Sequence, residues 1–89
     1  MYLHLGEKTV VPFAMVIGVF DLDNTSSSRN TRAYLERAQK EGRVIDVSGE
    51  LPRSFVVCAG KNGRDTVYLT QISARTLMRR AEVFEIGEL

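Results

Sequence analysis

Residues 53–81 carry the clearest pattern of hydrophobic and polar positions in the chain. The run RSFVVCA is rich in β-branched and aromatic residues, and the later run TVYLT alternates apolar with polar residues, as strands do. The pair Asn62-Gly63 lies between the two runs, and both residues tolerate the positive φ angles that a tight hairpin turn requires. The pattern therefore predicts a β-hairpin.

A helix is predicted directly after this hairpin. Ser73 is a good N-cap, and Ile72 and Leu77 are placed to form a hydrophobic staple across the first turn. We expect the helix to end with Arg79 and Arg80, because cations are favoured at the C-terminal end of the helix dipole. A hairpin and one short helix cannot bury their own apolar faces, so the rest of the chain must cover them.

The N-terminal third is predicted to form strands. Residues 1–11 suit two short strands that turn at Gly6-Glu7-Lys8, with Leu3 and Leu5 on the apolar face. Pro12 and Phe13 interrupt this pattern. The run AMVIGVFDL that follows is continuously apolar, which is typical of a central strand buried on both faces.

The middle of the chain is predicted to contain a basic helix over residues 29–41, stopped by Gly42, and a brief strand over residues 44–47. Residues 82–89 alternate apolar and acidic positions, and we interpret them as a strand, an interface tail or a frayed end. The predicted fold is a small α+β domain over residues 1–81, followed by a short acidic-apolar tail. Its sheet would be mostly antiparallel or mixed, with about five or six short strands and two helices.

The size of the chain points to self-assembly. A domain of 89 residues buries only about 60–65% of the surface that its unfolded form exposes. With one Cys and one His, the sequence shows no disulfide framework and no metal ligands that would compensate. Cys58 lies among apolar strand residues, which favours a buried, unreactive thiol in a reducing compartment. We therefore expect a homo-oligomer.

Several classes of protein are not indicated by the sequence. The longest apolar run, residues 10–20, is too short to span a bilayer and contains Pro12 and Gly18, so we expect a cytoplasmic protein without a membrane partner. The sequence has no phosphate-binding loop, nucleophile elbow, paired metal ligands or Cys–His constellation. We accordingly predict no enzymatic activity, no cofactor and no bound metal.

Charge is distributed unevenly along the chain, although the total is only +1. The segment 29–80 holds eleven of the twelve Lys and Arg residues against five acids, a net charge of +6, whereas the flanks together carry −5. Such asymmetry is typical of a face that binds anions, and it is also compatible with an ordinary solvated surface. The candidate contacts to DNA phosphates are Arg53, Lys61, Arg64, Arg75, Arg79 and Arg80. Arg79 and Arg80 could instead serve the helix end or a subunit interface.

Four segments of the chain, MYLHLG, VIGVFD, PRSFVV and TLMRRA, together resemble the RemA/RemB family of small bacterial regulators of extracellular-matrix and biofilm genes. The first and last of these place the chain closer to the RemB branch, and the resemblance extends from Met1 to about Ala81. It implies a cytoplasmic DNA-binding transcription regulator, whose RemA-type relatives assemble into rings with DNA along a basic rim. This sequence has Ala14-Met15 and Glu50-Leu51 where RemA-type proteins carry basic residues, and only Arg53 keeps a positive charge in the second patch.

Two main functional hypotheses follow. In the first, a basic face multiplied by oligomerisation binds double-stranded DNA, mainly through the phosphate backbone. In the second, the chain is an oligomeric scaffold or a protein-interaction module that does not bind DNA tightly, as Glu50, the near-neutral total charge and the acidic tail would favour. A small anionic ligand in a groove between subunits is a third possibility.

Overall fold

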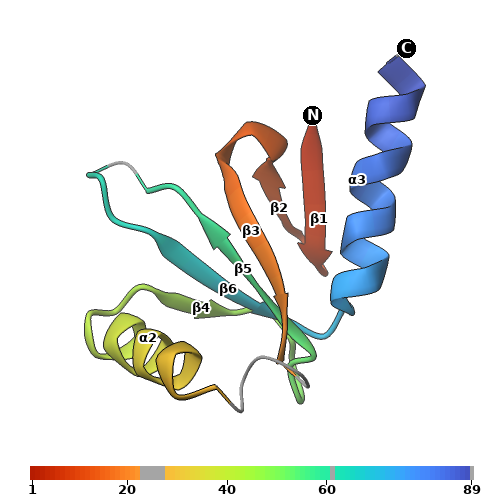
Figure 1. Ribbon diagram of the computed structural model, residues 1–89. Coiled ribbons are helices and arrows are strands. Elements are labelled where there is room, and N and C mark those ends of the chain that lie inside the picture. The colour runs from red at the N-terminus through yellow and green to blue at the C-terminus, as the bar shows by residue number, and fades with distance from the viewer. Residues whose placement is uncertain (23–27, 61, 89) are drawn as a thin grey trace.

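The computed structural model describes residues 1–22, 28–60 and 62–88, and within them it has six strands and two helices in an α+β arrangement (Figure 1). The predicted fold class is confirmed. The elements in chain order are β1 (Tyr2–Gly6), β2 (Thr9–Pro12), a 3₁₀ turn (Phe13–Met15), β3 (Val16–Asp21), α2 (Arg29–Lys40), β4 (Val44–Asp46), β5 (Ser54–Cys58), β6 (Thr66–Thr70) and α3 (Ala74–Glu88).

The strands form two sheets. The larger has the order β3-β5-β6-β4, in which β5 is antiparallel to both of its neighbours and β4 is parallel to β6. The smaller is the antiparallel β1–β2 hairpin. The large sheet separates two layers: α2 covers one face, and the β1–β2 hairpin with α3 covers the other (Figure 1).

The core lies on both faces of β5, which is buried at every position. Val56 and Cys58 pack with Leu3, Leu5 and Leu77 on the α3 side. Phe55, Val57 and Val67 pack with Ala38 on the α2 side. Burial on both faces explains why the sequence of β5 is a continuous apolar run rather than an alternating one.

The prediction that the long apolar run of residues 14–22 is a central strand is wrong. β3 is an edge of the four-stranded sheet, and β5 has the central position. Ile17 remains 61% exposed and Phe20 remains 39% exposed. An apolar run is equally compatible with a central strand that the same chain covers on both faces and with an edge strand whose apolar side chains remain exposed.

The predicted β5–β6 hairpin is confirmed, with a register that runs from Ser54 opposite Thr70 to Cys58 opposite Thr66. The connection between the two strands covers residues 59–65, and Gly63 within it adopts a positive φ (72°). Gly60 lies directly against the backbone of this loop, because a Cβ atom built on it would be 1.8 Å from the carbonyl oxygen of Arg64. The base of the loop therefore requires glycine at this position.

Helix α3 begins as predicted. The backbone N–H of Thr76 donates a hydrogen bond to the hydroxyl of Ser73 (3.2 Å), and Ile72 packs against the cluster that contains Leu77. The predicted end is wrong, since the helix continues to Glu88. Arg79 and Arg80 therefore lie inside the helix and not at the end of its dipole. The acidic-apolar segment is helical rather than a strand, because it contains several glutamates, which favour helices, and no proline.

Candidate nucleic-acid interface

Arg53 lies at the start of the β5–β6 hairpin, where its backbone is held on both sides. Its N–H donates to the carbonyl oxygen of Thr70 (2.8 Å), and its own carbonyl oxygen accepts from the N–H of Leu22 (3.1 Å). The side chain is exposed. A guanidinium on a fixed backbone at the protein surface is well suited to contact a phosphate.

The turn before Arg53 is also held by hydrogen bonds. The hydroxyl and the N–H of Ser48 both donate to Oδ1 of Asp46, at 2.5 and 2.9 Å, and these bonds lower the pKa of Asp46 below its ordinary value. After this turn the chain presents Glu50 and Leu51, the latter 84% exposed. The surface beside Arg53 is therefore mixed in character, with one acid, one apolar side chain and one cation.

Arg64 lies at the other end of the same hairpin, in the loop that Gly60 closes, and its side chain is exposed. The five residues of β5 separate it from Arg53, a distance along the strand of about 17 Å. Lys61, predicted to act with Arg64, lies outside the described residues. Arg53 and Arg64 thus mark two ends of the sheet rather than one cluster.

The three predicted arginines of α3 lie on the layer opposite α2. Arg75, Arg79 and Arg80 are all exposed. A guanidinium nitrogen of Arg80 donates to the carbonyl oxygen of His4 at 3.3 Å, so this side chain also joins α3 to β1. Within one protomer, therefore, the structure does not bring the described members of the predicted DNA-binding set together on one face.

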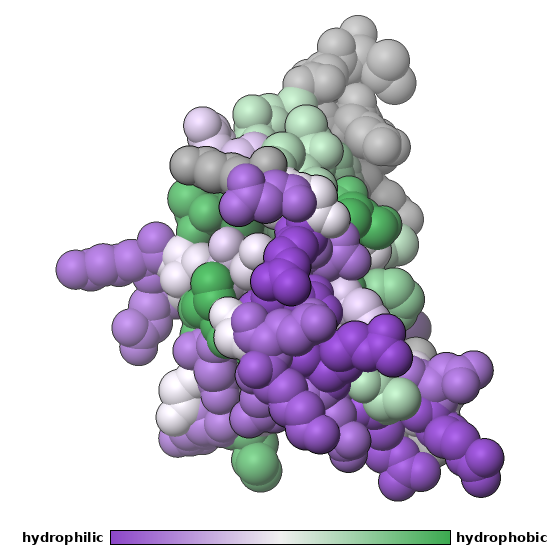
Figure 2. Space-filling view, turned by 90° about the vertical axis from the view of Figure 1, so that its left-hand side faces the viewer, coloured by the Kyte–Doolittle hydropathy of each residue, from purple (hydrophilic) through white to green (hydrophobic). Residues whose placement is uncertain are grey.

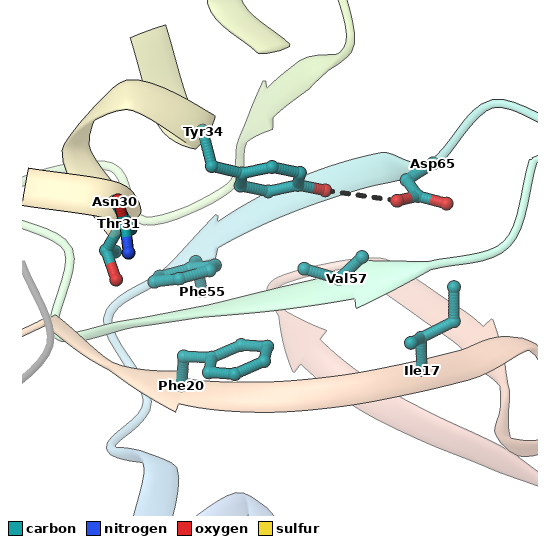
Figure 3. Close-up of a pocket in the computed structure, with 8 residues that line it drawn as sticks. All are labelled: Ile17, Phe20, Asn30, Thr31, Tyr34, Phe55, Val57 and Asp65. Atoms are coloured by element: carbon teal, nitrogen blue, oxygen red, sulfur yellow. Dashed lines mark hydrogen bonds between the residues drawn. The ribbon is translucent and has the colours of Figure 1, made fainter. Parts of the chain in front are cut away.

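A polar network that includes Arg43, which was not among the predicted DNA contacts, ties the C-terminal end of α2 to the loop of Arg64. The guanidinium of Arg43 donates to Glu41 and to the carbonyl oxygen of Asp65, both at 2.8 Å, and lies 6.0 Å from the centre of the Tyr34 ring. The Tyr34 hydroxyl donates to the Asp65 carboxylate at 3.3 Å (Figure 3). Burial raises the pKa of Tyr34, so its hydroxyl remains protonated as a donor. The sequence signal for this connection between α2 and the loop is the position of Arg43 next to Gly42, at the end of a predicted helix.

An open groove of about 320 Å³ runs between α2 and the edge strand β3 (Figure 3). Its floor is apolar: the rings of Phe20 and Phe55 stack with centres 4.9 Å apart, and Ile17 and Val57 continue the surface. Asn30 and Thr31 of α2 form part of its polar border. This arrangement provides apolar contact area.

The structure shows two further properties of the described residues. No group of three or more His, Cys, Asp or Glu side chains within them is placed to hold a metal ion. In the same part of the chain, no helix has the length and apolar character needed to cross a membrane.

Comparison with known proteins identifies the family. The model of the RemA-like family, described as extracellular matrix regulatory protein A-like, matches residues 2–81. The chain belongs to the RemA-like family. A relative within the same class, extracellular matrix regulatory protein B of Bacillus subtilis (strain 168), is 34% identical to this RemA-like chain over 87 residues, which cover 97% of the chain and 98% of the relative. The resemblance drawn from the four sequence segments is thus confirmed.

Proposed function

We propose that this RemA-like protein is a cytoplasmic DNA-binding regulator of the transcription of extracellular-matrix or biofilm genes. The observation that carries the proposal is the similarity, over almost the whole of both chains, to a protein named extracellular matrix regulatory protein B. The concentration of cations in residues 29–80 supports a polyanion as the binding partner.

Recognition would act mainly on the DNA backbone. The exposed cations at the two ends of the sheet, Arg53 and Arg64, are suited to phosphates. The arginines of α3 lie on the face of the large sheet opposite α2. They add to the contact with DNA only where the DNA, or a neighbouring protomer that binds it, reaches that face. Because one protomer makes few phosphate contacts, useful affinity requires several protomers acting on one duplex.

Self-assembly is the second part of the proposal, and the edge strand β3 is the surface that favours it. Ile17 and Phe20 leave apolar area exposed beside an edge whose backbone pairs only with β5 among the described residues. Soluble proteins usually cover such edges. A second copy is the natural cover, because β4 forms another open edge of the same sheet and edge-to-edge contacts between copies can close into a ring.

Fluorescence anisotropy measures the binding of a DNA duplex. A series of titrations at salt concentrations between about 50 and 200 mM tests the proposal. We expect affinity to fall steeply with salt, and to fall further when Arg53 and Arg64 are both replaced by Gln. Lys8→Gln is the matched control, because Lys8 is an exposed cation in the turn of the β1–β2 hairpin, which covers the face of the large sheet opposite α2. A folded protein that does not bind DNA, or binds it independently of salt, would contradict the proposal.

The alternative is an oligomeric scaffold that does not bind DNA tightly. It is favoured by Glu50 and the strongly exposed Leu51 beside Arg53, which suit a protein partner better than a phosphate. This alternative predicts a multimer in solution together with no salt-dependent binding of the duplex.

A further inference from the structure

Helix α2 presents cations along one side over its whole length. Its buried or half-buried positions, which include Thr31, Tyr34, Leu35 and Ala38, pack on or beside the sheet. At 3.6 residues per turn, the exposed positions on the opposite side form a single face. That face carries Arg29, Arg32, Glu36, Arg37 and Lys40, which are four cations and one acid.

These cations are not neutralised by ion pairs in the part of the chain that the structure describes. The salt bridge found there joins Arg43 to Glu41, beyond the end of the helix. Glu36 is the single acid on the exposed face of α2. Figure 2, which looks at the molecule from the side where α2 lies, shows a broad hydrophilic surface over the lower part of this view.

The placement of α2 connects the two ends of the sheet. At its first turn, Asn30 and Thr31 line the groove with Phe55, which lies two residues after Arg53. At its other end, Gly42 and Arg43 line a depression of about 220 Å³ together with Arg64. The helix thus spans the gap that separates the two predicted contacts.

We propose that the exposed face of α2 binds the phosphate backbone of DNA and joins Arg53 and Arg64 into one continuous basic band. This inference rests on the proposed function and assigns it an element that was not among the predicted contacts. Twelve residues of helix extend over about 18 Å, which corresponds to roughly five phosphates of one strand of duplex DNA. Cations distributed over that length suit a regularly spaced polyanion better than a single anionic ligand.

The test compares duplex binding by the wild type and by a variant with Arg32→Gln, Arg37→Gln and Lys40→Gln. Glutamine has nearly the helix propensity of Arg and Lys, so α2 should persist, which far-ultraviolet circular dichroism and a thermal melt check. For each phosphate contact removed, the slope of log affinity against log salt should become shallower by about 0.9. At about 0.1 M salt this corresponds to roughly an eightfold loss of affinity per contact.

Two single substitutions separate a local contact from a general effect of charge. Lys40→Gln and Lys8→Gln each remove one exposed lysine, and we expect the first to reduce affinity several times more than the second. Glu36→Gln removes the one acid from the face and should strengthen binding. These single substitutions keep the inference testable if the triple variant does not fold.

The outcomes distinguish the two proposals. If the wild type binds the duplex with a steep salt dependence and the folded triple variant has the same affinity and slope, the inference about α2 is wrong and the proposed function stands. Equal effects of Lys40→Gln and Lys8→Gln, or no gain from Glu36→Gln, would also overturn it. If the wild type does not bind duplex DNA, both proposals fail, and binding of an acidic protein surface would be the remaining role for the helix.

Discussion

Replacement of Ile17 by Lys is the sharpest test of self-assembly. Ile17 lies on the edge strand β3 and is 61% exposed in a single protomer. If a second copy covers this edge, most of the side chain's apolar surface becomes buried on assembly. A lysine at the same position would place a charge in that contact.

The size of the effect follows from the exposed fraction. Full burial of an isoleucine side chain contributes about 1.5–3 kcal/mol, so the 61% that remains exposed represents about 1–2 kcal/mol for each subunit contact. Loss of that burial alone weakens each contact about 5- to 30-fold, and the charge weakens it further. The protomer itself should lose only about 0.5–1 kcal/mol, because the smaller part of the side chain is buried within it.

Light scattering coupled to size exclusion measures the mass of the particle, and a thermal melt reports the stability of the protomer. We expect a multimer for the wild type and a smaller, folded species for Ile17→Lys. Val10→Lys is the matched control, since Val10 is a β-branched residue on β2 that is 51% exposed but lies on the other sheet. A variant with the mass of the wild type, or a monomeric wild type, would refute the assignment of β3 as the contact.

Three further predictions concern the fold. Gly60→Ala should destabilise the protein by about 1–3 kcal/mol in chemical denaturation, because the new methyl group would collide with the carbonyl oxygen of Arg64; a normal denaturation midpoint would contradict this. Thr70→Val should cost about 1–3 kcal/mol, because the buried hydroxyl of Thr70 donates to the carbonyl oxygen of Leu5, and an unchanged stability would show that this bond contributes nothing. Burial raises the pKa of the Cys58 thiol, so a thiol reagent at about pH 8 should react slowly with the native protein and rapidly after unfolding; equal rates would show that the thiol is accessible.

The local elements were largely predictable from the sequence. Alternation marked the second strand of the hairpin, and the cap at Ser73 marked the start of α3, because both signals depend on residues close together in the chain. The end of α3 was misplaced because two arginines were interpreted as a terminal feature, although nothing after them interrupts a helix. Asn62-Gly63 marked the connection between β5 and β6, because glycine tolerates the positive φ that Gly63 adopts.

The arrangement of the candidate site was predictable only in part. The separation of Arg53 from Arg64 follows from the predicted hairpin, which places its start and its loop at opposite ends. The contribution of α2 depends on which strands it packs against, and that is set by contacts between residues distant in sequence, such as Tyr34 with Asp65. Charge in the sequence therefore identified the candidate cations but not where the fold places them.

The groove beside β3 and the cations of α2 lie on neighbouring sides of the same helix, so the two proposals together predict that assembly is coupled to binding of DNA. Asn30 borders the groove, whereas Arg37 and Lys40 lie on the exposed face. A copy that covers the groove would place its own basic face next to the first, and affinity would then depend on the number of protomers aligned.

Ile17→Lys adds one positive charge to each protomer, so a simple electrostatic effect predicts tighter binding of DNA. If aligned protomers are required, affinity should fall instead, by an order of magnitude or more, despite the added charge. Anisotropy titrations of Ile17→Lys and of Val10→Lys at the same salt concentration show whether DNA affinity rises or falls. A gain in affinity for Ile17→Lys would show that single protomers bind on their own.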